Sequence, residues 1–343
     1  MRRSGMGKTG EVFPLAGYGT LRVDLEQTTI KDGETLAGVV RLDLTEAIDV
    51  LALSLDVFGK ERLQWEDSVQ GKQIKDHPIL SGAIPLLLPP LKDPSAILSS
   101  GHHEFPFTFQ LLVDLAPSFA YKTWRVEDLE NVHVYVEYTI TVKLMLTGPQ
   151  EAELFWSVPF VVEASECVDP EFEGKPMTVS TTQSVRSLGV IKTGKCFLRM
   201  DLDNDTQDAM SPVQVRVTID NASRQALKTI HLNLYEDVSI DRHFSGENHH
   251  SESSRLVCTR RFDPSTFQSD SAVTLVLPTT PNDLYQFKPV LPTMRTHFIQ
   301  SLSYRVAVEC SMSSGGHAEL WAPIRVIRPP GPLLTSVRGG PSS

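Results

Sequence analysis

The sequence contains a long internal repeat. Residues 21–26 read Leu-Arg-Val-Asp-Leu-Glu, and residues 198–203 read Leu-Arg-Met-Asp-Leu-Asp, at an offset of 177 residues. The similarity continues without a gap, because the apolar positions of residues 36–43 recur in residues 213–220. This period is too long for a solenoid or a propeller blade, whose repeats span a few tens of residues. The repeat therefore predicts one domain present twice in tandem.

Within each copy, apolar residues alternate with polar residues, which is the period of a half-buried strand. Turn signals such as Lys31-Asp-Gly-Glu34 separate the strand-like runs, and no amphipathic pattern extends over three helical turns. We predict an all-β chain of two tandem immunoglobulin-like β-sandwich domains. The expected layout is a flexible lead-in at 1–19, an N-terminal sandwich at 20–164, a linker at 165–190, a C-terminal sandwich at 191–328 and a disordered tail at 329–343.

Composition limits the partners of the chain. The net charge of −10 argues against nucleic acid and anionic lipid as general partners, because neutralising phosphates requires clustered Lys and Arg. No segment approaches the run of about 18 apolar residues that a membrane helix needs, and no apolar run follows Arg2 and Arg3 as a secretory leader requires. The 343 residues contain four cysteines without a C-x-x-C spacing, which favours a reducing compartment. We expect a cytoplasmic protein.

No catalytic or cofactor constellation is recognisable, so we expect neither an enzyme nor a bound cofactor. The chain contains no G-x-S-x-G or H-E-x-x-H motif. One acidic loop, with Asp201, Asp203, Asp205 and Asp208, begins like a calcium loop but has Thr206 where the turn glycine belongs. A calcium-dependent membrane-binding sandwich therefore stays open as a distant alternative.

Several motifs occur in an order that resembles the arrestin family, closest to its α-arrestin branch, the arrestin-domain-containing proteins. Residues 101–110 (Gly-His-His-Glu-Phe-Pro-Phe-Thr-Phe-Gln) and 116–119 (Ala-Pro-Ser-Phe) are similar to the family signature G-x-H-x-F-P-F-x-F-x-L followed by P-x-S-F. Residues 31–38 resemble its early turn, and residues 292–308 and 323–326 resemble its late proline turn and closing strands. The resemblance spans about residues 20–327.

The resemblance implies the arrestin fold and a non-catalytic adaptor or scaffold. Such a protein binds cytoplasmic tails of membrane receptors or transporters and directs their endocytosis, sorting or ubiquitination, with recruitment to the plasma membrane or endosomes. Family members that recruit ubiquitin ligases carry P-P-x-Y, whereas neither Pro-Pro pair of this chain is followed by Tyr. A ligase is therefore expected only through a bridging protein. The runner-up is an arrestin-shaped coat subunit of a retromer-like sorting complex.

Two groups of residues are candidates for partner binding. Arg255, Arg260 and Arg261 form a small basic group that suits an anionic partner. A short proline-rich segment follows the second predicted domain and suits a polyproline-binding groove. Its candidate residues are Pro329, Pro330 and Pro332.

Overall fold

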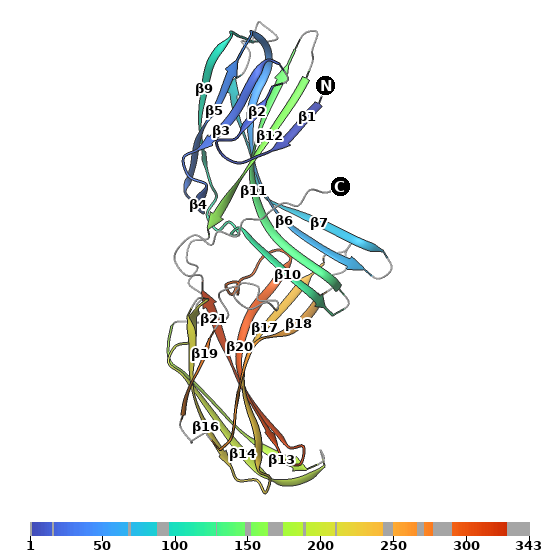
Figure 1. Cartoon of the computed structure of the whole chain (residues 1–343), viewed down its shortest axis with the longest axis vertical. Helices are drawn as coiled ribbons and strands as arrows, with labels where there is room; N and C mark the ends of the chain where they lie inside the picture. Colours follow the sequence, from blue (N-terminus) through green and yellow to red (C-terminus); the bar gives the residue numbers. More distant parts are fainter. Residues whose placement is uncertain are drawn as a thin grey trace. The chain divides into compact units, whose positions relative to one another are not determined.

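The computed structural model describes residues 2–15, 17–67, 70–87, 96–127, 129–147, 152–163, 174–187, 190–209, 211–242, 250–265, 271–276 and 290–327. Every regular element within these ranges is a β-strand, so the predicted all-β class is confirmed. The chain divides into unit 1 (Met1–Trp124 and Leu129–Cys167) and unit 2 (Arg125–Asp128 and Val168–Ser343). Each unit is a β-sandwich (Figure 1).

Unit 1 contains two sheets. The larger has the order β1-β12-β11-β6-β7, with β10 beside β11, β4 beside β12 and β8 beside β6; the smaller has the order β2-β3-β5-β9. The strands are β1 (Arg2–Met6), β2 (Val12–Pro14), β3 (Gly19–Leu25), β4 (Thr29–Lys31), β5 (Thr35–Leu44), β6 (Ile48–Asp67), β7 (Gly71–Leu87), β8 (Ala96–Leu98), β9 (Gly101–Gln110), β10 (Phe119–Val126), β11 (Leu129–Leu146) and β12 (Ala152–Glu163).

Unit 2 repeats this arrangement with sheets of order β13-β14-β16-β19 and β15-β21-β20-β17-β18. The strands are β13 (Met177–Ser187), β14 (Ile191–Leu202), β15 (Thr206–Asp208), β16 (Pro212–Asn221), β17 (Leu227–Asp241), β18 (His250–Phe262), β19 (Ser271–Val276), β20 (Ile299–Met312) and β21 (His317–Ile327).

Each sandwich encloses its own apolar core. In unit 1 the fully buried Val23 and Val40 of the smaller sheet belong to one cluster with Leu55, Ile140 and Val158 of the larger. The alternating apolar residues of each strand form these inward faces, because successive strand residues point to opposite sides of the sheet. Each fully buried Val or Leu contributes about 1.5–3 kcal/mol relative to an exposed position. The corresponding core of unit 2 includes Met200, Val215, Leu234, Val306 and Ile324.

The internal repeat is also visible in equivalent hydrogen bonds. The Tyr138 hydroxyl of β11 donates to the carbonyl oxygen of Ala116 at 2.6 Å, and the Tyr304 hydroxyl of β20 donates to that of Leu291 at 2.8 Å. Both acceptors immediately precede a proline in the sequence. Two residues after each acceptor, a side-chain oxygen accepts a strand amide at 2.9 Å: Val162 N to Ser118 Oγ in unit 1, and Val326 N to Thr293 Oγ1 in unit 2. The P-x-S-F motif and its counterpart in unit 2 thus fasten a loop to the last strand of each sandwich.

The aromatic motif of residues 101–110 forms β9, which ends the smaller sheet of unit 1. Pro106 lacks an amide proton, and an edge strand tolerates this loss. Phe107 lies opposite Gly38 of β5, where an added Cβ would approach the Phe107 ring within 2.8 Å. The early turn motif and the aromatic motif are therefore neighbours, and Gly38 provides the space that the ring needs.

Two predicted non-strand segments contain strands. The predicted lead-in at 1–19 contains β1 and β2, and the predicted linker at 165–190 contains β13, which pairs along its whole length with β14. Gly and Ser in the first segment, and Ser and Thr in the second, resemble loop composition. Pairing with a long neighbouring strand overrides this local tendency, because β structure depends strongly on tertiary context.

Candidate functional site

The structure assigns Arg255 to a buried ion pair. Arg255 lies opposite Glu236 in the β17–β18 register. Its Nε lies 3.1 Å from Glu236 Oε1 and its Nη2 lies 2.9 Å from Oε2. The Glu236 side chain is only 3% exposed, whereas the Arg255 side chain is 34% exposed. The guanidinium fork thus neutralises a buried carboxylate in a two-point contact.

Comparison of the two copies explains why unit 2 needs this pair. Glu236 faces Tyr304 in the β17–β20 register, and the single Tyr304 hydroxyl proton is shared between Leu291 O at 2.8 Å and Glu236 Oε2 at 3.3 Å. In unit 1 the residue opposite Tyr138 is Gly59, and an added Cβ there would overlap the Tyr138 ring. In unit 1 the Tyr138 ring therefore occupies the space beside Gly59. In unit 2 the equivalent position is Glu236, whose buried carboxylate requires a cation.

The other two arginines do not share one surface. Arg260 lies opposite buried Leu232, with its guanidinium carbon 5.3 Å from the centroid of the Phe262 ring, whereas exposed Arg261 lies opposite His231. Adjacent strand residues face opposite sides, so these two side chains diverge. Partner binding by the three arginines stays a prediction.

The second predicted group of partner-binding residues is not covered by the structure. Pro329, Pro330 and Pro332 lie outside the described residues.

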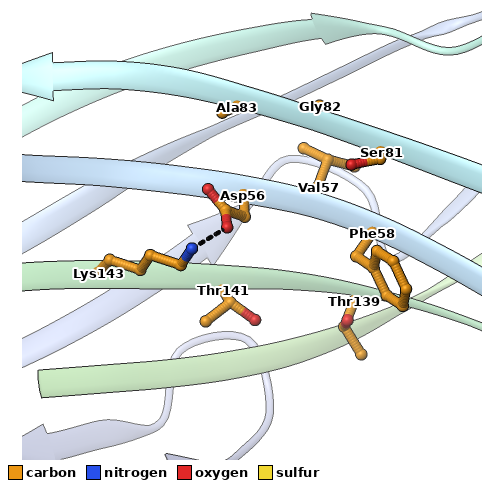
Figure 2. Close-up of a pocket in the computed structure, with 9 residues that line it drawn as sticks. All are labelled: Asp56, Val57, Phe58, Ser81, Gly82, Ala83, Thr139, Thr141 and Lys143. Carbon is orange, nitrogen blue, oxygen red and sulfur yellow. Dashed lines mark ion pairs between the residues drawn. The ribbon is translucent and has the colours of Figure 1, made fainter.

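A hollow of about 490 Å³ lies on the outer face of the larger sheet of unit 1 (Figure 2). The side chains of Lys143 on β11 and Asp56 on β6, both of which line the hollow, point toward one another and form an ion pair. Alternation brings polar groups of three strands to this face, with Phe58 as the aromatic member. The lining residues are Asp56, Val57, Phe58, Ser81, Gly82, Ala83, Thr139, Thr141 and Lys143.

The hollow combines polar groups with one aromatic ring. Thr141 Oγ1 lies 2.8 Å from Ser157 Oγ, so one threonine hydroxyl is engaged by a neighbouring strand. The lining residues include no cysteine and no histidine, so no serine or threonine among them has a histidine base beside it. Hydroxyl groups, one ion pair and a 38%-exposed Phe58 ring are suited to contact an extended polar peptide. Sequence reasoning missed these residues, although the alternation of Thr139, Thr141 and Lys143 along one predicted strand marked a polar face.

Paired charges continue along the same sheet. Arg62 of β6 holds Asp76 of β7 through Nε–Oδ1 and Nη2–Oδ2 distances of 2.5 and 2.6 Å. This hydrogen bonding lowers the pKa of the Asp76 carboxyl and raises the pKa of Arg62. Lys60 similarly lies 2.9 Å from Glu137 on β11. Positive and negative side chains are thus interspersed along this part of the sheet.

The acidic loop is engaged in structural contacts. Asp205 Oδ1 accepts the amides of Gly174 and Lys175 at 3.0 and 3.2 Å, and Asp201 Oδ1 accepts the Thr178 hydroxyl at 2.5 Å. Asp203 pairs with Arg216. Within the described residues, no three His, Cys, Asp or Glu side chains form a group that could hold a metal ion.

Three cysteines of unit 2 have weakly acidic thiols. Burial raises the pKa of Cys196 and of Cys258 to about 11, and that of Cys310 to about 12. Since the thiolate is the reactive form, none of these three side chains is activated as a nucleophile. No helix that could cross a lipid bilayer occurs in the described part of the chain.

The family comparison agrees with the geometry of unit 1. Residues 20–153, from β3 into the beginning of β12, match the family model described as Arrestin (or S-antigen), N-terminal domain. The matched region contains the β9 motif, the Ala116 loop and most strands of both sheets of unit 1. Residues 20–153 of unit 1 are thus similar to the arrestin N-terminal domain, and the two β-sandwiches of the chain are consistent with the arrestin fold.

Proposed function

We propose that this protein is a non-catalytic adaptor that captures extended segments of other proteins. The observation that carries the proposal is the match of residues 20–153 to the arrestin N-terminal domain. The hollow around Phe58 and its alternating charges support it, because they offer contacts to a peptide rather than groups for catalysis.

The mode of capture that the fold favours is the addition of a strand to a sheet edge. Edge strands present unpaired amide and carbonyl groups, and an extended peptide satisfies them with regular hydrogen bonds. Within the described residues β13 pairs only with β14, and β18 pairs only with β17. Side chains of alternate peptide residues would then contact the adjoining faces, which gives such a site its specificity.

The finer proposal is that the captured segments are cytoplasmic parts of membrane receptors or transporters. The α-arrestin-like motifs support this assignment, and the expected consequence is directed endocytosis or sorting of the bound protein. A ubiquitin ligase would join through a bridging protein, because the chain contains no P-P-x-Y. The same chain as a stoichiometric subunit of a retromer-like coat is the runner-up.

Affinity purification of the tagged full-length chain from its own cells tests these alternatives. An adaptor is expected to recover membrane receptors or transporters in substoichiometric amounts and to migrate mainly as a small species in size exclusion. A coat subunit would elute in a large complex of fixed composition. Recovery of neither class, with an unchanged protein profile after calcium chelation, would refute the adaptor and leave only the fold.

A further inference from the structure

The larger sheet of unit 1 has an added strand at one edge. Strand β1 runs parallel to β12 with Arg2 opposite Glu153 and Met6 opposite Ser157 (Figure 1). The ladder continues for one more bond, from the amide of Gly7 to the carbonyl oxygen of Ser157 at 3.0 Å. Residues 2–7 therefore occupy the edge of β12 in the way that a bound peptide would.

The fit of this strand depends on two glycines. A Cβ at Gly5 would lie 2.7 Å from the Trp156 ring, and a Cβ at Gly7 would overlap the same ring more closely still. The Trp156 ring also contacts the Phe13 ring, with centroids 4.7 Å apart and planes 30° apart. Trp156 is only 6% exposed although it lies next to the sheet edge. Residues 5–7 thus cover the Trp156 ring, which leaves room for a peptide backbone but not for a side chain at Gly5 or Gly7.

Strand β1 is held loosely on the edge of β12. Ser4 is exposed and Met6 is 67% exposed, so neither packs into a core. Glycine also loses more conformational freedom on ordering than any other residue. The Trp156 Nε1 donor is buried and finds no acceptor among the described residues, which further penalises the closed arrangement.

The chain is fastened again immediately after β1. The Thr9 hydroxyl oxygen accepts the Leu25 amide at 2.9 Å, and the Gly10 amide donates to the Val23 carbonyl oxygen at 2.9 Å. Both bonds join this segment to β3 of the smaller sheet. Residues 2–7 can therefore leave β12 while residues 9 and 10 keep their place, which makes β1 a tethered occupant of the edge.

We propose that the β12 edge from Glu153 to Ser157, walled by Trp156 and Phe13, is a peptide-binding slot. Its ligand is an extended segment that runs parallel to β12 and carries glycine at two alternate positions. β1 is the resident occupant, and a partner peptide binds by displacing it. The inference rests on the proposed function in that it names one peptide site of the adaptor. Its test uses the chain's own segment as the probe, so its outcome does not depend on the identity of any cargo.

The test compares the wild-type full-length chain with a Gly5→Val/Gly7→Val variant, and the probe is a labelled synthetic peptide of residues 2–9. The two valines are expected to drive β1 from the slot, exposing Trp156 with a red shift of tryptophan emission. The probe should bind this variant at least tenfold more tightly than it binds wild type, because wild type carries a tethered competitor. It should also reverse the red shift.

Two controls define the specificity of the slot. Met6→Val, on the exposed side of the same strand, should leave emission and probe affinity as in wild type. A probe with valine at both glycine positions should bind the double variant at least tenfold more weakly than the natural probe. Equal binding of both probes, or equal affinity of the natural probe for the double variant and wild type, would overturn the proposal.

Hydrogen exchange on the unmodified chain provides a readout that needs no variant. If β1 leaves the edge as a unit, its amides should exchange at least tenfold faster than those of β11 in the middle of the same sheet. Equal protection of the two strands would mean that β1 is a permanent part of the sandwich and would contradict displacement.

Discussion

Replacement of Arg255 by alanine is expected to destabilise unit 2. The change leaves the Glu236 carboxylate buried, 3.3 Å from a Tyr304 hydroxyl whose one proton is shared with the Leu291 carbonyl oxygen. It also removes two charge-assisted hydrogen bonds, of 3.1 and 2.9 Å. The expected effect is therefore on folding.

The size of the effect follows from the burial of the two groups. Removing one partner of a fully buried pair costs about 3–5 kcal/mol, because the other charge stays behind without compensation. Here Glu236 is 3% exposed but Arg255 is 34% exposed, so water enters part of the vacated space. We expect a loss of about 2–3 kcal/mol in the free energy of unfolding, below the fully buried range for this reason.

Urea denaturation of the full-length chain measures this loss, with hydrogen exchange of β17 and β20 peptides assigning it to unit 2. Arg261→Ala on the same strand is the matched control and should change stability by no more than about 0.5 kcal/mol, as exposed sites do. Adding Glu236→Gln to the alanine variant should recover part of the loss, because a neutral amide is less costly to bury than a charge. Equal stabilities of the Arg255→Ala and Arg261→Ala variants would refute the structural role of Arg255.

Three further outcomes are expected. Tyr138→Phe leaves a backbone acceptor unpaired and should cost about 1–2 kcal/mol of unfolding free energy in urea titration, whereas a neutral result would contradict the loop-fastening role. Hydrogen bonds that the His102 ring donates to Asp43 and Glu104 raise the pKa of His102 above 6.5, so NMR should find a higher midpoint that falls in Asp43→Asn. The stabilisation from His102 should be present below pH 6.5 and lost as pH rises through the elevated pKa. Cys196 and Cys310 should react with a thiol reagent only after unfolding, as read by mass spectrometry, and rapid native labelling of either would conflict with their burial and raised pKa values.

The fold could be predicted from the sequence because the strand pattern is visible in short segments and occurs in both halves of the chain. Alternation of apolar residues predicts the strands, and the 177-residue offset predicts that two similar domains follow one another. The P-x-S-F motif was recognisable as a signature, but its physical role required the structure. Only there do the Tyr138 hydroxyl and the Ala116 carbonyl meet, 22 residues apart.

The missed features depend on contacts between distant residues. Residues 2–7 are rich in glycine and read as a lead-in, and nothing near them in sequence indicates that Trp156 needs a glycine-lined neighbour. Arg255 is visible as a charge, but its partner Glu236 lies across a strand pair whose register shifts between Leu234 and Tyr235. A one-residue shift moves side chains to the other face, so sequence alone did not determine which arginine reaches a carboxylate.

The most direct test of the account is hydrogen exchange of the full-length chain with and without a membrane-protein segment that it captures from its own cells. Addition of a strand predicts protection of backbone amides in a pattern limited to one side of a sheet, along β13 or β18, or along β12 where a peptide replaces β1 and binds more tightly. Protection confined to loops, or no protection on any of these strands at saturating peptide, would contradict an adaptor that works by strand addition.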